Sequence, residues 1–165
     1  HLSTLPELQS VHLLGTDVFE DMIHEAKSAV ARAGLLDRIE LLQDDVHESR
    51  LPPGFADVIV SRSTLHHWSD PVRALREIYR VLKPGGTALI VDVRRDAPEV
   101  AVREFNQFRE KAGLGPSFLD EKYTAHEVQA FAEEAGLRSC SSVDVGKQGL
   151  NALGLSLRIR KRRDA

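Results

Sequence analysis

Short apolar runs that are typical of β-strands alternate with stretches of helical periodicity along most of this 165-residue chain. The clearest run, 87–92, places Ala, Leu, Ile and Val in succession, so both faces of the strand would be apolar. Such a strand is typical of a parallel sheet with helices on each side. The order is strand, helix, strand, strand, helix, strand, two helices and a hairpin, which predicts an α/β fold with a mostly parallel sheet.

The bounds of these elements come from apolar periodicity and from capping signals. Asp70 and the capping box Thr124–Glu127 each begin a helix, and Lys83–Gly86 ends one because proline cannot continue it. Strands are predicted at about 11–16, 39–43, 56–61, 87–92, 137–145 and 153–160, the last two as an antiparallel hairpin turning at 146–149. Helices are predicted at about 19–33, 71–82, 98–112 and 125–135.

Length and composition limit the classes of protein that fit. At 165 residues the chain is expected to form one domain over residues 1–165. A net charge of −3 gives no general reason to expect a nucleic-acid or membrane partner, and no apolar run approaches the ~20 residues that span a bilayer. The single cysteine, Cys140, cannot form an internal disulfide, so we expect a reducing, cytoplasmic setting.

Four short segments occur in an order and spacing that resemble one enzyme family. They are 15–22, where an acidic residue ends a strand, 43–46 (Gln-Asp-Asp-Val), 55–68, which ends in Leu-His-His-Trp, and 80–86 (Arg-Val-Leu-Lys-Pro-Gly-Gly). Together they resemble class I S-adenosylmethionine-dependent methyltransferases, in particular the group that acts on small molecules. The resemblance covers about residues 8–92. It implies a Rossmann-like three-layer sandwich that ends in an antiparallel hairpin.

One part of the family pattern has no counterpart in this sequence. The family begins with a strand and a glycine-rich loop, and that first strand is the central one of its sheet. It would lie between the strand ending at Asp17 and the strand containing Val58. We therefore expect an N-terminally truncated fragment of a longer chain. The alternatives are a sheet that pairs differently across the gap, or one completed by another chain.

Polar residues at the carboxyl ends of the predicted strands are the candidates for binding the cofactor, S-adenosylmethionine, because ligands of α/β sheets bind there. The resemblance implies that Asp17 accepts the ribose hydroxyls and that Asp45 and the Val46 amide contact adenine. Asp44 could take the role of Asp45, and Met22 could pack on adenine or in the core. The full set of candidate cofactor-binding residues is Asp17, Val18, Met22, Asp45, Val46, Ser61 and Ser63.

His66 and His67 are the candidate catalytic residues, because a neutral imidazole can act as a general base. The alternative is that the two histidines pack in the loop or support the cofactor. Arg62 could pair with a carboxylate or lie on the surface, and Trp68 is expected to be a packing anchor. Adjacent histidines point apart and no ligand cluster accompanies them, so no metal site is predicted.

The segment 98–123 is a candidate substrate cap, because Phe105, Phe108, Phe118 and Tyr123 occur in it beside glycine and proline. The alternative is that its phenylalanines form only the core face of a helix.

These observations predict an S-adenosylmethionine-dependent methyltransferase acting on a small molecule, by direct displacement. The alternative is a degenerate, non-catalytic relative that uses the fold for binding or assembly. A nicotinamide dehydrogenase fits less well, because it too needs a glycine-rich phosphate loop. The sequence leaves open the acceptor, the acceptor atom and the oligomeric state, with a homo-oligomer compatible with it.

Overall fold

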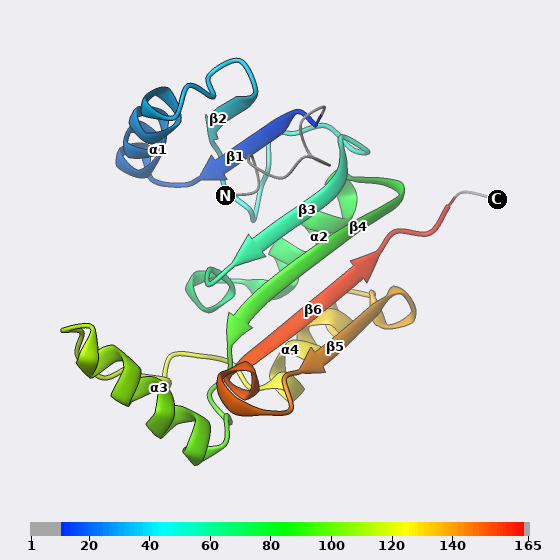
Figure 1. Ribbon diagram of the computed structural model, residues 1–165. Coiled ribbons are helices and arrows are strands. Elements are labelled where there is room, and N and C mark those ends of the chain that lie inside the picture. Colours follow the sequence, from blue (N-terminus) through cyan, green and yellow to red (C-terminus); the bar gives the residue numbers. More distant parts are fainter. Residues whose placement is uncertain (1–10, 164–165) are drawn as a thin grey trace. The chain divides into compact units, whose positions relative to one another are not determined.

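The computed structural model describes residues 11–163 (Figure 1). Contacts within the chain divide it into two compact units, one ending at Arg50 and the other beginning at Leu51. The first unit is a small β-α-β element, and the second contains a four-stranded sheet with its own hydrophobic core.

In the first unit two parallel strands flank one helix. Strand β1 (Leu13–Asp17) pairs with β2 (Ile39–Gln43), so that Asp17 lies opposite Gln43. Helix α1 (Glu20–Arg32) connects them and turns its buried Ile23 inward. Gly34, with a φ of +68°, follows the end of α1 in the left-handed conformation that glycine adopts easily. The predicted strands and helix of this region are confirmed.

The sheet of the second unit has the strand order β3-β4-β6-β5. Strand β3 (Ala56–Arg62) runs parallel to β4 (Leu82–Val93). Strand β6 (Gly154–Arg160) lies between β4 and β5 (Ser141–Val145) and is antiparallel to both, which confirms the predicted hairpin. The α/β class is therefore confirmed, with mixed pairing: two strand pairs are parallel and two are antiparallel.

Helices α2 (Pro71–Val81) and α4 (Ala125–Glu134) pack against each other and cover one face of this sheet (Figure 1). The Asp70 side chain accepts a hydrogen bond from the Arg73 amide, and Thr124 and Glu127 form the predicted capping box. Buried side chains of α2, β4 and β6 belong to the hydrophobic core of this unit. They are Ala74, Leu75, Ile78, Val81, Ala88, Ile90, Leu155, Leu157 and Ile159. Full burial of each leucine or isoleucine contributes about 1.5–3 kcal/mol.

Strand β4 begins earlier than predicted. Ala56 of β3 already pairs with Leu82, whereas Val58 pairs with Thr87, so the residues Lys83–Gly86 bulge out of the ladder instead of simply ending a helix. A Cβ atom on Gly86 would lie 2.9, 3.0 and 3.2 Å from three backbone carbonyl oxygens. Only glycine fits this close approach, which explains the residue type within the bulge.

Two further predictions near the carboxyl end were wrong in detail. Residues Arg138–Cys140 form a 3₁₀ helix, η4, and do not extend β5. The hairpin connection is not a four-residue turn, because it contains a second 3₁₀ helix, η5 (Gly149–Leu153). Helix α3 (Glu99–Lys111) packs on η5 and buries Ala101. Phe108, which the core-face alternative would bury, is 61% exposed.

Among the described residues, β1 pairs only with β2, and β3 pairs only with β4. The described strands thus form two separate sheets, β1-β2 and β3-β4-β6-β5. Direct pairing of β1 with β3, the alternative in which the sheet closes across the gap, does not occur in the described part of the chain.

Candidate functional site

Two of the candidate carboxylates lie at one edge of the first unit. Asp17 is the last residue of β1, and Asp45 follows the last residue of β2 by two positions. The Asp44 amide donates to the Asp17 carbonyl at 2.9 Å, which continues the strand pairing beyond the ladder. The parallel arrangement therefore brings the Asp17 and Asp45 segments together, as expected for neighbouring strand ends.

One of the two carboxylate oxygens of Asp17 accepts a hydrogen bond from the described protein. Its Oδ1 accepts from the Phe19 amide at 2.9 Å, which fixes the side chain at the start of α1. Its Oδ2 has no hydrogen-bond partner among the described residues. An acceptor oxygen held in place and left without a donor suits a ligand hydroxyl.

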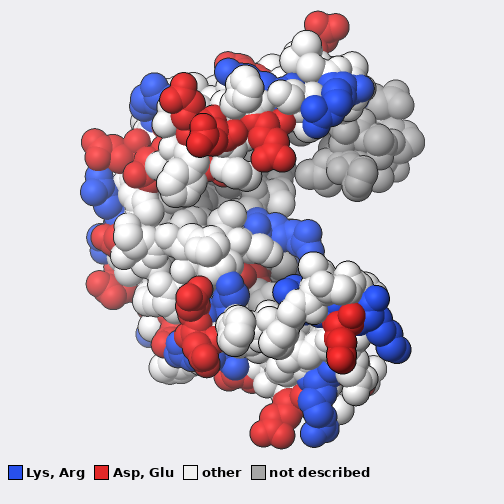
Figure 2. Space-filling view, turned by 90° about the vertical axis from the view of Figure 1, so that its left-hand side faces the viewer, with Lys and Arg blue, Asp and Glu red and all other residues white. Residues whose placement is uncertain are grey.

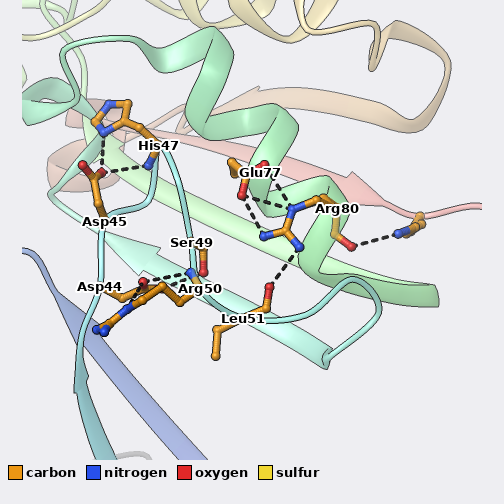
Figure 3. Close-up of polar contacts among 9 residues, drawn as sticks. Asp44, Asp45, His47, Ser49, Arg50, Leu51, Glu77 and Arg80 are labelled. Atoms are coloured by element: carbon orange, nitrogen blue, oxygen red, sulfur yellow. Dashed lines mark hydrogen bonds and ion pairs between the residues drawn. The ribbon is translucent and has the colours of Figure 1, made fainter.

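Asp44 and Asp45 differ sharply, although they are adjacent (Figure 3). The Asp44 side chain is 5% exposed, and it accepts from Ser49 Oγ at 2.5 Å and from the Arg50 amide at 3.0 Å. It holds its own loop together. The Asp45 side chain is 49% exposed, and its Oδ1 accepts from the amide of His47 at 2.8 Å and from Nδ1 at 2.6 Å. Of the two, Asp45 is the carboxylate that a ligand could reach.

Backbone and apolar groups beside these carboxylates also remain open. No described residue accepts from the Val46 amide, and Val18 and Met22 are about half exposed. The exposure of Met22 argues against its core alternative. These groups together fit a nucleoside. The acceptor carboxylate and the unpaired amide complement the polar edge of adenine, and the exposed apolar side chains complement its faces.

In the second unit, the candidate residues after β3 form a tight turn. The hydroxyls of Ser61 and Thr64 are hydrogen-bonded to each other. Ser63 has a φ of +58°, a left-handed conformation that is uncommon for a residue other than glycine, and its amide donates to the Val91 carbonyl at 2.8 Å. The turn is therefore held in a strained conformation at the carboxyl end of the sheet, where strain often accompanies function.

The loop before β3 is fixed by a residue of α2 (Figure 3). Arg80 bonds the Glu77 carboxylate through Nε and Nη2, and its Nη1 donates to the Leu51 carbonyl at 2.9 Å. The Arg80 carbonyl in turn accepts from the Gly54 amide at 3.0 Å. This network anchors the start of the second unit and leaves the opposite end of β3 to carry the candidate site.

His66 and His67 lie in a short 3₁₀ helix, η3 (Leu65–His67). Nδ1 of His66 is 2.8 Å from Oδ2 of Asp92, and the two side chains are 6% and 3% exposed. His67 is exposed, and its ring centroid is 3.8 Å from that of His66. Sequence reasoning missed Asp92. The available signal was an acidic residue ending an otherwise apolar strand, as at Asp17.

A cavity of about 560 Å³ lies within the second unit at the same end of the sheet. Its walls come from the ends of β3 and β4, from η5, from the β5–β6 hairpin and from Phe105 of α3. Arg62 and Asp144 are charged residues in its lining, and neither has a partner among the described residues. Its size suits a small molecule.

The segment 98–123 contributes unequally to this cavity. Phe105 lines it, whereas Phe108 and Phe118 are exposed, and Tyr123 packs edge-on against Phe131 with ring centroids 4.9 Å apart. Trp68 is buried, which agrees with its expected role as a packing anchor. The substrate-cap role of the segment stays a prediction.

Charged side chains are interspersed on the face shown in Figure 2, where acidic and basic groups of the described residues alternate. In the described residues, no group of three or more His, Cys, Asp or Glu side chains could hold a metal ion. None of the helices described is both long enough and apolar enough to cross a membrane.

Comparison with known proteins places the chain in a family. Residues 2–90 match the family model described as "Methyltransferase domain". The chain is 30% identical over 165 residues to phosphoethanolamine N-methyltransferase 1 of Arabidopsis thaliana, covering 97% of this chain and 31% of that protein. It is 30% identical over 89 residues to the chloroplastic 2-methyl-6-phytyl-1,4-hydroquinone methyltransferase of Spinacia oleracea, covering 54% of this chain and 26% of that protein.

The chain thus spans a third or less of the length of these two relatives. Among solved structures, a SAM-dependent methyltransferase from Aquifex aeolicus superposes with a TM-score of 0.66 at 24% identity, covering 90% of this chain and 68% of that one. At that identity the superposition shows the fold. The family match covers more than half of the chain, and the chain belongs to the methyltransferase-domain family.

Proposed function

We propose that this chain takes part in S-adenosylmethionine-dependent methyl transfer to a small-molecule acceptor. The observation that supports it most is the pairing of the family match with the open groups at the ends of β1 and β2. Asp17 Oδ2 and the Val46 amide have no partner among the described residues, and the Asp45 carboxylate, which accepts from His47, is 49% exposed; a nucleoside cofactor needs groups of these kinds. The non-catalytic alternative is not favoured by the named enzymes among the relatives.

Bound S-adenosylmethionine would supply a methyl group on a positively charged sulfur. The residues of the first unit would hold its nucleoside: Asp17 would accept from the ribose hydroxyls, Asp45 and Val46 would contact adenine, and Val18 and Met22 would pack beside them. In the second unit, Ser61 and Ser63 are the candidates for contacts to the methionine part. Catalysis would then rest mainly on positioning the acceptor for in-line displacement.

The acceptor would occupy the cavity of the second unit. The relatives named above act, by their names, on phosphoethanolamine and on a phytyl hydroquinone. Phosphoethanolamine carries charges of both signs, which the unpartnered Arg62 and Asp144 would complement. A hydroquinone would instead use the apolar walls and Phe105. Both compounds are therefore suitable first acceptors for an assay that measures formation of S-adenosylhomocysteine.

Calorimetric titration of the full chain with S-adenosylhomocysteine tests the cofactor site. We expect binding by the wild type and a loss of about 10- to 100-fold in affinity for Asp17→Ala, because hydrogen bonds to a charged group contribute about 1.5–3 kcal/mol. Asp21→Ala is the matched control, since Asp21 is an exposed acid in the first turn of α1 and should leave the affinity unchanged. A folded wild type that binds nothing, or an Asp17→Ala variant of normal affinity, would contradict the proposal.

A further inference from the structure

We propose that Asp92 is a positioning residue: it fixes His66 as the tautomer protonated at Nδ1 and so leaves Nε2 as the proton-accepting nitrogen. The part of this inference that concerns the methyl acceptor rests on the proposed function. The tautomer itself is a property of the protein alone and can be measured without cofactor or acceptor.

The geometry of the pair carries the assignment. Asp92 is the second-last residue of β4 and His66 lies in η3, 26 residues away in sequence, yet Nδ1 of His66 and Oδ2 of Asp92 are 2.8 Å apart. Both side chains are almost fully buried. Among the described residues, Asp92 is also the one buried residue whose side chain is polar or charged. A buried carboxylate without donors is costly, so its presence here requires the bonds that it accepts.

Asp92 acts as an acceptor at both of its oxygens. Oδ1 accepts from the Val93 amide at 2.8 Å, and Oδ2 accepts from the His66 amide at 3.3 Å in addition to Nδ1. Backbone amides can only donate, so they orient the carboxylate with its acceptor lone pairs toward the donors. The shared hydrogen between Oδ2 and Nδ1 is therefore assigned to the imidazole. In a neutral ring this leaves the lone pair on Nε2.

Nε2 of His66 remains available. Nε2 has no hydrogen-bond partner among the described residues. The buried side-chain nitrogens and oxygens without a partner in that part of the chain are Arg38 Nε and Ser141 Oγ, so Nε2 is not fully enclosed. The exposed ring of His67 lies beside that of His66, tilted by 47° from it. Asp92 also lines the cavity proposed for the acceptor, and His66 is bonded to it from η3.

This arrangement suits removal of a proton from an acceptor oxygen or nitrogen. The O–H or N–H bond of the acceptor would break and its proton would pass to Nε2. The electron pair left on the acceptor atom would form the bond to the methyl group, while the methyl–sulfur bond of the donor would break with its electron pair going to sulfur. The ring then carries hydrogen on both nitrogens, and its positive charge faces the Asp92 carboxylate. A carboxylate behind a histidine gives this orientation and support in other general-base sites.

Long-range ¹⁵N–¹H correlation spectra of the ¹⁵N-histidine-labelled full chain, recorded at a pH where the rings are neutral, test the proposal. We expect the neutral His66 ring, assigned through its backbone resonances, to carry its proton on Nδ1. In Asp92→Ala the population should move toward Nε2–H. Asp57→Ala is the control, because Asp57 is an exposed acid paired with Lys83 and should leave the His66 tautomer unchanged.

A wild-type His66 protonated at Nε2 would overturn the assignment, and this result needs no variant. An unchanged tautomer in a folded Asp92→Ala variant would overturn the role of Asp92. A merely structural carboxylate would alter stability without moving the proton between the ring nitrogens. Failure of S-adenosylhomocysteine to bind would count against the proposed function but would leave the tautomer result standing, so the two failures can be told apart.

Discussion

The turn after β2 and the end of β4 each contain a nearly buried aspartate, and the two are held in different ways. Asp44 accepts from Ser49 and Arg50, five and six residues further along the chain. Asp92 accepts from His66, 26 residues earlier and in another element. Burial is almost the same, at 5% and 3% side-chain exposure. The first carboxylate therefore organises one loop, whereas the second ties a loop to the sheet.

The largest expected effect is the difference in unfolding free energy between alanine variants of these two aspartates. Asp92→Ala leaves Nδ1 of His66 and the amides of His66 and Val93 without an acceptor, so we expect the second unit to lose about 3 kcal/mol of unfolding free energy. Trp68, the single tryptophan, is buried next to η3 and reports this unit by fluorescence during urea denaturation.

Asp44→Ala is the matched comparison. Its bonds lie within its own loop in the first unit, so the Trp68 transition should change by less than about 0.5 kcal/mol. Equal shifts of the Trp68 transition for both variants would show that the distinction between local and long-range carboxylates does not hold here.

Glu127 combines both kinds of contact and should give an intermediate effect. Its Oε2 accepts from the Thr124 amide at 2.7 Å, and Arg95, 32 residues away, donates to both of its oxygens. The Thr124 amide is the main reason that the pKa of Glu127 lies below its usual value, with the Thr124 hydroxyl and Arg95 adding to it. Glu127→Ala should cost about 1 kcal/mol near neutral pH, and Arg95→Ala less.

The pH dependence of the Glu127 effect has a definite sign. A carboxyl whose pKa is lowered by folding stabilises the folded state above its unfolded pKa, and this contribution is lost as pH falls through the folded pKa. The difference between wild type and Glu127→Ala should therefore shrink below about pH 4 in urea denaturation followed at Trp68. Glu121→Ala, at an exposed acid, is the control; a deficit that stays constant with pH would refute the assigned role.

The smallest effect is expected at Cys140, whose thiol donates to the Leu137 carbonyl at 3.4 Å. Burial raises the pKa of this thiol, while Arg162 and Tyr79 act in the opposite direction. Because the thiolate is the reactive form, alkylation by iodoacetamide at neutral pH should be several-fold slower in the folded chain than in urea. The rate should also begin to rise at a higher pH in the folded chain; matching pH profiles would contradict this.

Features with local causes could be predicted from the sequence. Apolar runs ended by acids predicted β1 and β2, and an apolar run ended by Ser61 predicted β3. The caps at Asp70 and Thr124 predicted where α2 and α4 begin. The placement of Asp17 and Asp45 at neighbouring strand ends follows from the same local signals together with parallel pairing.

Features that depend on distant partners could not be predicted in this way. The bulge at Lys83–Gly86 exists because Ala56 pairs with Leu82, a choice that involves two separate segments. The exposure of Phe108 depends on how α3 packs on η5, whereas periodicity predicts only that the apolar residues of α3 share one face of the helix. The contact between Asp92 and His66 also depends on distant partners. Both residues can be read in the sequence, but they meet only when β4 is in place beside β3 and η3.

The bulge in β4 also governs how the chain can vary. At Gly86 a single added carbon would press on three backbone oxygens, none of which belongs to a side chain that could swing aside. At Gly115 nothing lies within 4 Å of the same added carbon, and its φ is outside the left-handed range. Two glycines of one chain thus lie at opposite ends of mutational tolerance. Substitution is therefore tolerated at Gly115 and excluded at Gly86.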